Sequence, residues 1–441
     1  MKDILYNSQI ALRRWPVILA LLIIAAAALV KWQSSLMPED TYILANPSPA
    51  VNAKTYFEKA TTLLTPEIGK IAPNGTDMKN DAGTSYNDYT QSQKDEIILK
   101  NRPAFAELEQ GFSYPYEDMS KRSFFTLFPM YAKERAVARA LNSAGDDSVA
   151  HGDWDGAMND SLDSVQMGAM LPHGSSLIGM LVGEACEAIG RHNAYGLIAH
   201  LTYDQSVSAV RRLETINSLE QQPYECLADE EHFTQGSLLD LFRTTNWRKE
   251  LTGDSSDSND SSSGNHTDLI TEIRWHTESP RTAFDNYTKA MNAEIAISQL
   301  AWPQQIHHPA PQVPSDPINQ MLFPIFTQAT FREYGTLTGD RLIEIEIALH
   351  AYKLAHGNYP AKLDELTPSL LTAIPDDPFS NNQPFKYRLT GSKYLLYSIG
   401  PDAVDDGGKP IFDNSPSRKL IPYQLYQSDQ KGDVVAGFNN I

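Results

Sequence analysis

An uncharged apolar segment near the N-terminus, Trp15–Val30, most constrains how this chain of 441 residues can fold. Its sixteen residues come close to the ~20 that cross a bilayer as a helix. Trp15 and Trp32 stand at its two ends, where interfacial aromatic residues are typical, and Lys31 can extend its side chain toward the headgroups. We therefore predict a transmembrane anchor over residues 15–32.

Basic residues before this segment predict its orientation. Lys2, Arg13 and Arg14 favour a cytoplasmic N-terminus, so the bulk of the chain would lie in the periplasm of a bacterial cell. The alternative is a secretory signal peptide cleaved after Ala25–Ala28, which would release a soluble protein. We favour the anchor because apolar residues continue past these alanines.

The acidic composition narrows the choice of partners. Lys and Arg number 36 and Asp and Glu number 55, which gives a formal charge of −19. A surface with this charge repels nucleic acid. We therefore expect no nucleic-acid partner, and instead one or more protein partners in the cell envelope.

Helical periodicity dominates residues 51–301, with apolar stripes or plausible helices over 52–64, 94–110, 123–144, 176–200, 204–219 and 281–301. The stretch GDWDGA, in which Gly152 turns the chain and Asp155 starts the next helix, resembles the turn of a tetratricopeptide-type hairpin. A second copy of this unit is not evident. Residues 252–268 are polar and of low complexity, which predicts a disordered loop.

Two further features are a proline-rich segment and a pair of cysteines. Five prolines between Trp302 and Pro317 predict an extended linker over 302–322. Cys186 and Cys226 could form one disulfide in an exported protein or remain two buried thiols, and the sequence does not decide between these states.

The C-terminal part, 323–441, carries sharper signals. A helix is predicted over 326–356 and ends at Gly357, after which Pro360 prevents its continuation. The strands KYRLT and KYLLYS flank Gly391 and Ser392, a pattern typical of a β-hairpin.

This order of motifs resembles the globular part of the major pseudopilin of type II secretion systems. The matching positions are the Tyr-x4-Gly-x-Tyr-Pro segment from Tyr352, the DP-x5-P-x2-Y segment from Asp377 and the strand that ends at Ser398 before an acidic, glycine-rich loop. The resemblance implies a pilin-like α+β fold. The layout of anchor, helical region and pilin-like tail also resembles uncharacterised bacterial membrane proteins.

The acidic loop is a candidate calcium site. In the pseudopilin family this loop binds Ca²⁺, an ion that prefers six to eight oxygen ligands. Asp402, Asp405 and Asp406 offer carboxylates, and the carbonyl groups of Ser398 and Gly400 could complete the shell. The alternative is a solvated β-turn without an ion, since clusters of Asp and Gly are common in turns.

No catalytic motif is evident. The sequence lacks G-x-S-x-G, H-E-x-x-H, paired C-x-x-C and P-loop patterns. Glu184 and Glu187 are interpreted as solvated charges on a helix. We therefore expect a protein that is not an enzyme and that has no catalytic residues.

Together these patterns predict an α+β chain whose fold is mainly helical. The expected parts are a cytoplasmic tail (1–14), a transmembrane anchor (15–32), a stalk (33–50), a helical domain (51–301), a linker (302–322) and a pseudopilin-like domain (323–441). The expected function is interaction or assembly in the envelope, linked to type II secretion or pilus-like machinery. The alternatives are an envelope enzyme with a site in the helical domain and a secreted binding protein.

Overall fold

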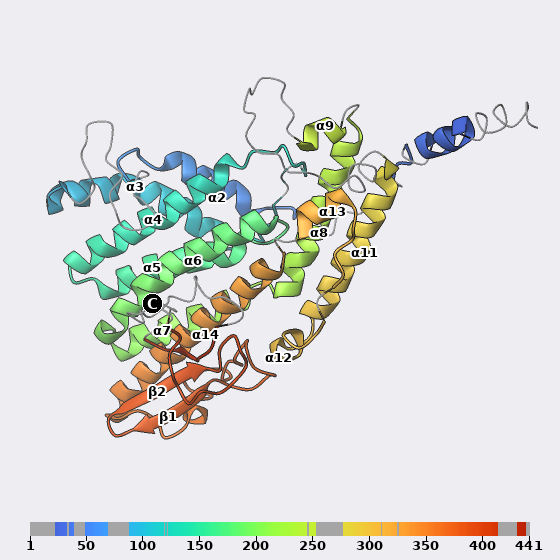
Figure 1. Cartoon of the computed structure of the whole chain (residues 1–441). Coiled ribbons are helices and arrows are strands. Elements are labelled where there is room, and N and C mark those ends of the chain that lie inside the picture. The colour runs from blue at the N-terminus through green and yellow to red at the C-terminus, as the bar shows by residue number, and fades with distance from the viewer. Residues whose placement is uncertain are drawn as a thin grey trace, which may run out of the picture.

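The structure is a computed structural model that describes residues 23–32, 35–38, 49–68, 88–118, 120, 122–244, 247–252, 277–309, 311–323, 326–412 and 430–437. Within these ranges the fold is mainly helical, and a small antiparallel sheet lies near the C-terminus (Figure 1). This confirms the predicted helical fold with a β-hairpin at its end. The predicted disordered loop falls almost entirely outside the described residues.

The helices of the first part are α2 (Ala53–Leu63), α3 (Gln91–Gly111), α4 (Pro129–Ala150), α5 (Trp154–Met170), α6 (Leu177–Leu197), the 3₁₀ helix η2 (Ile198–His200), α7 (Tyr203–Asn217), α8 (Pro223–Phe242), α9 (Trp247–Thr252) and α11 (Pro280–Ser298). The later elements are α12 (Trp302–Gln305), α13 (Pro317–Leu322), α14 (Phe326–His356), the 3₁₀ helix η4 (Leu363–Leu366), β1 (Lys386–Thr390), β2 (Lys393–Ser398) and β3 (Val434–Val435).

Helices α2–α6 form a stack in which consecutive helices pack side by side (Figure 1). The turn between α4 and α5 lies where the sequence predicts it, with Gly152 at a φ of +73°. The cap residue is Asp153, whose carboxylate accepts a hydrogen bond from the Gly156 N–H at 2.9 Å, and not Asp155, which the sequence predicts. Helix α4 begins at Pro129, six residues later than predicted, because proline suits the first turn of a helix.

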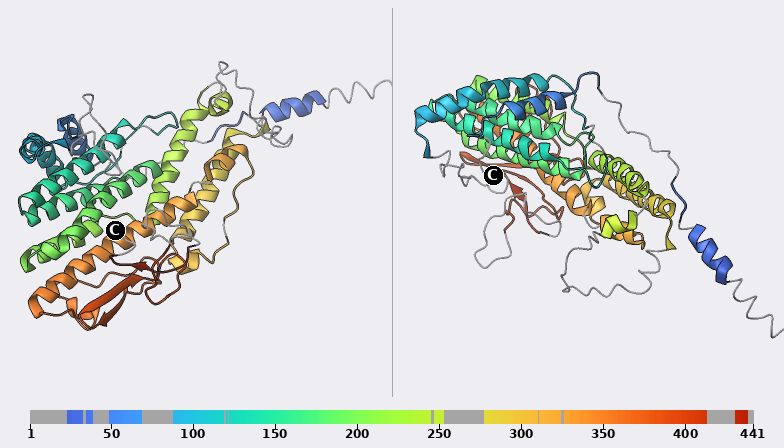
Figure 2. Two further views of the ribbon diagram at one scale, coloured as in Figure 1. Left: turned by 60° about the vertical axis from the view of Figure 1, so that its left-hand side comes forward. Right: turned by 90° about the horizontal axis from the view of Figure 1, so that it is seen from above.

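Helices α8 and α11 pack against each other as a separate pair beside the stack (Figure 2). Their core contains Leu238, Phe242, Tyr287 and Met291. Cys226 of α8 and Cys186 of α6 are both buried free thiols, so this structure has them unpaired.

Helix α14 lies between the helical stack and the sheet, and one hydrophobic core runs through all three. This core contains residues of α5, α6, α7, α14 and the sheet, among them Val165, Leu213, Ile345, Leu349 and Leu396. Gly357, at a φ of +79°, follows the helix as predicted, and its N–H binds the Lys353 carbonyl.

The sheet has the strand order β1–β2–β3 with antiparallel neighbours. The hairpin pairs Lys386 with Tyr397 and Thr390 with Lys393, so Gly391 and Ser392 form the turn as predicted. Strand β3 adds Val435 opposite Tyr397. Its position brings the segment after residue 430 back beside the acidic loop.

The segment predicted as an extended linker contains α12 and α13, and part of it belongs to the core of the C-terminal part. Trp302 is 6% exposed and packs against Phe331, Tyr334 and Phe379. Its indole N–H donates a hydrogen bond of 2.8 Å to the Pro401 carbonyl. The core of the C-terminal part therefore begins before residue 323, because this tryptophan fills the space between α14 and the acidic loop.

Part of the predicted anchor lies outside the described residues. Residues 23–32 are helical and exposed, and they stand apart from the rest of the described chain (Figure 1). Within the described ranges, no helix combines the length and the apolar composition that a membrane span requires.

Candidate functional site

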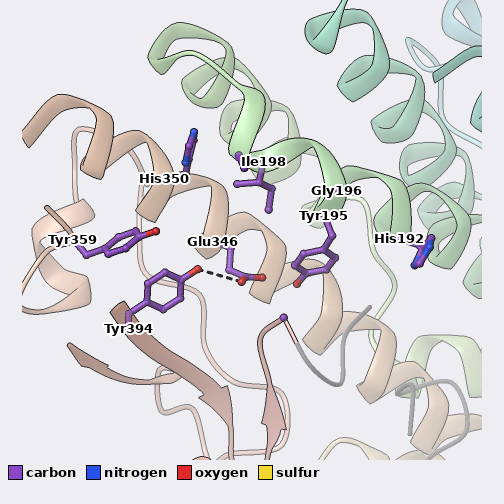
Figure 3. Close-up of a pocket in the computed structure, with 10 residues that line it drawn as sticks. His192, Tyr195, Gly196, Ile198, Glu346, His350, Tyr359 and Tyr394 are labelled. Atoms are coloured by element: carbon purple, nitrogen blue, oxygen red, sulfur yellow. Dashed lines mark hydrogen bonds between the residues drawn. The ribbon is translucent and has the colours of Figure 1, made fainter. Parts of the chain in front are cut away.

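A pocket of about 490 Å³ lies at the junction of the helical stack and the C-terminal part (Figure 3). We call it the junction pocket. Its lining residues come from α6 and η2 on one side and from α14, β2 and the segments after α14 and β3 on the other: His192, Tyr195, Gly196, Ile198, Ala199, Glu346, His350, Tyr359, Tyr394 and Gly437. Its volume is within the usual range for small-ligand sites.

Helical spacing brings the functional side chains to one place. His192 and Tyr195 are three residues apart on α6, and Glu346 and His350 are four residues apart on α14, so each pair lies on one face of its helix. Tyr394 reaches the pocket from β2, where it pairs with Leu389 of β1. Figure 3 shows Tyr195 and Tyr394 directed toward Glu346 from opposite sides.

Glu346 is the acidic group of the pocket, and it is 8% exposed. Its Oε1 accepts a hydrogen bond of 3.2 Å from the Tyr394 hydroxyl, and the Tyr195 hydroxyl lies close enough to this carboxylate to lower its pKa. Among the described residues, no donor meets its buried Oε2 with hydrogen-bond geometry. Burial raises the pKa of Glu346 to about 7, although the two tyrosine hydrogen bonds act in the opposite direction.

Aromatic rings form much of the pocket wall. The Tyr359 ring meets the Tyr394 ring edge to face, with 4.7 Å between centroids. The Lys353 ammonium lies 4.8 Å from the Tyr359 centroid, a cation–π distance. His350 donates from Nε2 to the Leu201 carbonyl at 3.1 Å, which holds its ring at the pocket edge.

The predicted calcium ligands lie in one loop, but this conformation does not direct their carboxylates to a common point. Asp402 accepts from the Val404 N–H at 3.2 Å, and Asp405 accepts from the Gly407 N–H at 3.0 Å and from the Tyr397 hydroxyl at 2.9 Å. Burial raises the pKa of Asp402, and repulsion from nearby Asp406 adds to this shift.

The two other predicted ligands also have partners. The Gly400 carbonyl accepts from the Ala403 N–H at 3.0 Å. Ser398, whose carbonyl is the predicted ligand, is positioned through its hydroxyl, which donates to Asp377 at 2.6 Å. The oxygen-rich composition suits Ca²⁺, but an ion would require the Asp402 and Asp405 carboxylates and the Gly400 carbonyl to turn from their present partners. Calcium binding at this loop therefore stays a prediction.

Asp433 is a loop residue that the sequence did not indicate. Its carboxylate accepts hydrogen bonds from three backbone N–H groups of the loop, those of Asp406, Gly408 and Lys409, at 3.3, 2.7 and 3.1 Å. Burial raises its pKa to about 6 despite these bonds. Asp433 lies about thirty residues after Asp402 in the chain, so no local pattern could have pointed to it.

A buried charged cluster lies beside the junction pocket, between α6 and α14. Arg191 forms an ion pair with Asp340, and the carboxylates of Glu187 and Glu220 lie within 4.8 Å of the Asp340 carboxylate. Glu184 and Glu187 are 7% and 3% exposed, so their interpretation as solvated charges was wrong. Burial and neighbouring acids raise the pKa values of Glu187 and Glu220.

A search of protein-family models, of curated proteins and of solved structures found no match to this chain. Arguments about function therefore rest on the residues of the chain itself. The acid at Glu346 was the signal available in the sequence, because it interrupts the apolar run of a predicted helix. Its partners Tyr195 and Tyr394 lie far from it in the chain.

Proposed function

We propose that this chain is a membrane-anchored interaction protein of the bacterial cell envelope, with its bulk in the periplasm, and that the junction pocket is where it holds a ligand or partner. The observation that carries the proposal is a pocket at the meeting of two parts of the chain, with a buried acid and three tyrosines in its wall. Sites of this kind often lie between structural units.

The chemistry of the lining is suited to recognition. The lining consists of aromatic, small and apolar residues with two histidines and one carboxylate. Aromatic and apolar walls with a few polar groups are typical of ligand sites.

The pilin-like character of the C-terminal part belongs to the same proposal. A helix of 31 residues packs on an antiparallel hairpin, and an acidic loop follows the second strand. This order supports a relation to pseudopilins and to type II secretion or pilus-like machinery, with Ca²⁺ as an ion that stabilises the loop.

A test is photo-crosslinking in cells that make the full chain. A photoreactive residue replaces Ala199, an exposed residue of the pocket lining, and in a second strain it replaces Leu99 of α3, which is 70% exposed. We expect a covalent adduct from the Ala199 strain alone, in membranes that keep the chain after a carbonate wash. Equal crosslinking at both positions would rule out the pocket as the contact site, and a shortened soluble chain would favour the secreted alternative.

An enzyme with acid–base chemistry is the second candidate, and Glu346 is the observation that favours it. A carboxyl group with a pKa of about 7, at hydrogen-bond distance from the Tyr394 hydroxyl, suits general acid or base catalysis near neutral pH. Incubating a metabolite extract with the protein and with Glu346→Gln would reveal a compound that the unaltered protein alone consumes. Identical extracts in both samples would argue against catalysis at this pocket.

A further inference from the structure

The junction pocket contains a buried hydrogen-bond acceptor without a donor. Glu346 Oε1 accepts a hydrogen bond from Tyr394, and the Tyr195 hydroxyl lies near the carboxylate, whereas no donor of the described residues meets the buried Oε2 with hydrogen-bond geometry. A buried acceptor that loses water without gaining a donor costs about 1–3 kcal/mol. Because Glu346 also lines the pocket, a turn of its carboxylate would bring Oε2 to a ligand there, which would supply the missing donor.

The groups around Glu346 Oε2 favour a donor with a positive charge. Tyr195 approaches from α6, Tyr394 from β2 and Tyr359 from the segment after α14, and aromatic rings attract cations through their negative faces. Glu346 is the one acid among the described lining residues. When ionised, it gives the pocket a negative charge that favours a cationic group.

The positive groups near the pocket do not neutralise this carboxylate through a described contact. Lys353 lies over the Tyr359 ring, and Arg191 is ion-paired with Asp340 in the adjacent charged cluster. His350 points its Nε2 at the Leu201 carbonyl, and His192 lines the far side of the pocket (Figure 3). Both histidines oppose a cationic ligand when they are protonated.

Geometry distinguishes between types of cation. A guanidinium group pairs best with both oxygens of a carboxylate, but Oε1 is already occupied by a tyrosine hydroxyl. A quaternary ammonium has no N–H to donate to Oε2. A primary ammonium is a compact charge with three donors, so it can satisfy one oxygen while the aromatic rings surround it.

We propose that the junction pocket binds the primary ammonium group of its ligand, with Glu346 Oε2 as the acceptor and Tyr359 and Tyr394 as the aromatic wall. This inference rests on the proposed role of the pocket as a binding site and specifies the chemistry of its ligand. The ammonium can belong to a free diamine or to a lysine side chain of a protein partner.

Calorimetry on the detergent-solubilised full chain tests the proposal with two amine probes, 1,5-diaminopentane and the peptide Gly-Lys-Gly. The matched negative probes are 1,5-pentanediol and Gly-Arg-Gly. We expect saturable binding of at least one amine probe. Its matched negative probe should bind at least about tenfold more weakly, because it cannot form the charge-assisted hydrogen bond. Binding of the diamine alone indicates a small free amine, and binding of the peptide alone indicates a partner's lysine.

Two glutamate variants separate the pocket from general effects on folding. Glu346→Gln keeps the side-chain shape and should weaken amine binding about tenfold or more. Glu344→Gln is the control, because Glu344 is also a buried acid of α14, 3% exposed, but bonds to Asn217 outside the pocket lining. Amine binding should be unchanged in Glu344→Gln.

The proposal is overturned if neither amine probe binds, if Gly-Arg-Gly binds as tightly as Gly-Lys-Gly, or if both variants weaken binding equally. These outcomes differ from a failure of the proposed function. If position 199 gives crosslinks but no amine binds, the protein is still an interaction protein, and its ligand is not an amine. If an amine binds but position 199 gives no crosslinks, the pocket binds a small ligand and the proposed protein partner is wrong.

Discussion

Arg191 on α6 and Asp340 on α14 form an ion pair that excludes water, with 1% and 0% of their side-chain surfaces exposed. The guanidinium also donates to the Thr336 carbonyl at 3.4 Å. A side chain at Gly339 would meet Arg191, since its Cβ would lie 2.9 Å from Arg191 Nε. The missing side chain at this glycine therefore gives the arginine room to lie against α14.

Replacing the arginine should be costly for folding. Arg191→Met leaves the Asp340 carboxylate buried without its cation, so we expect the free energy of unfolding to fall by about 3–5 kcal/mol. Denaturant titration of the full chain measures this change. The double variant Arg191→Met, Asp340→Leu removes both charges and should recover most of the loss. A single variant as stable as the original chain would show that the pair contributes little.

Mild acid should stabilise the protein. Burial raises the pKa values of several acids to about 7: Glu134, Asp160, Glu184, Glu231, Glu344 and Glu346. Each of these carboxyl groups binds a proton more tightly in the folded protein than in the unfolded chain. The protonated group therefore contributes its full stabilisation below the unfolded pKa near 4, and this contribution is lost as the pH rises through the folded pKa of about 7. We expect a higher Tm at pH 5.5 than at pH 8.

Glu344→Gln provides a direct check on this pH effect. The variant removes one titrating acid, so the change in its unfolding free energy between pH 5.5 and pH 8 should be smaller than that of the original chain by about 2 kcal/mol. Denaturant titrations at the two pH values measure that difference. A Tm that rises from pH 5.5 to pH 8 in the original chain would contradict the prediction.

Trp302 should contribute strongly to stability even though the sequence placed it in a linker. Trp302→Ala removes a buried indole from the core it shares with Phe331 and Phe379, so we expect a loss of about 3–5 kcal/mol in the free energy of unfolding. Trp302→Phe should recover part of it, since the hydrogen bond to Pro401 would still be missing. Melting curves that match the original for Trp302→Ala would place this residue outside the core.

Calcium binding by the acidic loop has a measurable signature. An ion that binds the folded state alone stabilises it by about 2.7 kcal/mol at a hundredfold excess over Kd. We expect a higher Tm in calcium than in chelator, and loss of this difference in Asp402→Ala. Asp364→Ala, which removes an exposed acid of η4, should keep it. Equal Tm values in calcium and chelator for the original chain would leave the loop as a turn without an ion.

Local signals in the sequence predicted the C-terminal part well. Gly357 ends α14 and Gly391 turns the hairpin because both positions need a positive φ, which glycine adopts readily. Leu354 of α14 is 48% exposed because it lies in the last turn of the helix, near the end of the core.

The junction pocket and the charged cluster depend on contacts between distant residues. Glu346 meets Tyr195 and Tyr394 because α6, α14 and β2 pack together, and no spacing along the chain encodes that meeting. Glu187 was interpreted as a solvated charge, yet it is 3% exposed. Its neighbours Ala185, Cys186, Ala188 and Ile189 are apolar, so the same signal of burial was present in the sequence around Glu187 as around Glu346.

The position of α14 also limits how copies of this protein could join. A helix can join copies of a protein only if its apolar face is free to meet a neighbouring copy. Here the middle of α14 contacts α6 and α7 on one side and β2 on the other, with Leu342, Ile345 and Leu349 fully buried. Exposing each such side chain costs about 1.5–3 kcal/mol. A fibre built through α14 would first have to separate the tail from the helical stack, so assembly by that route and the native fold exclude each other.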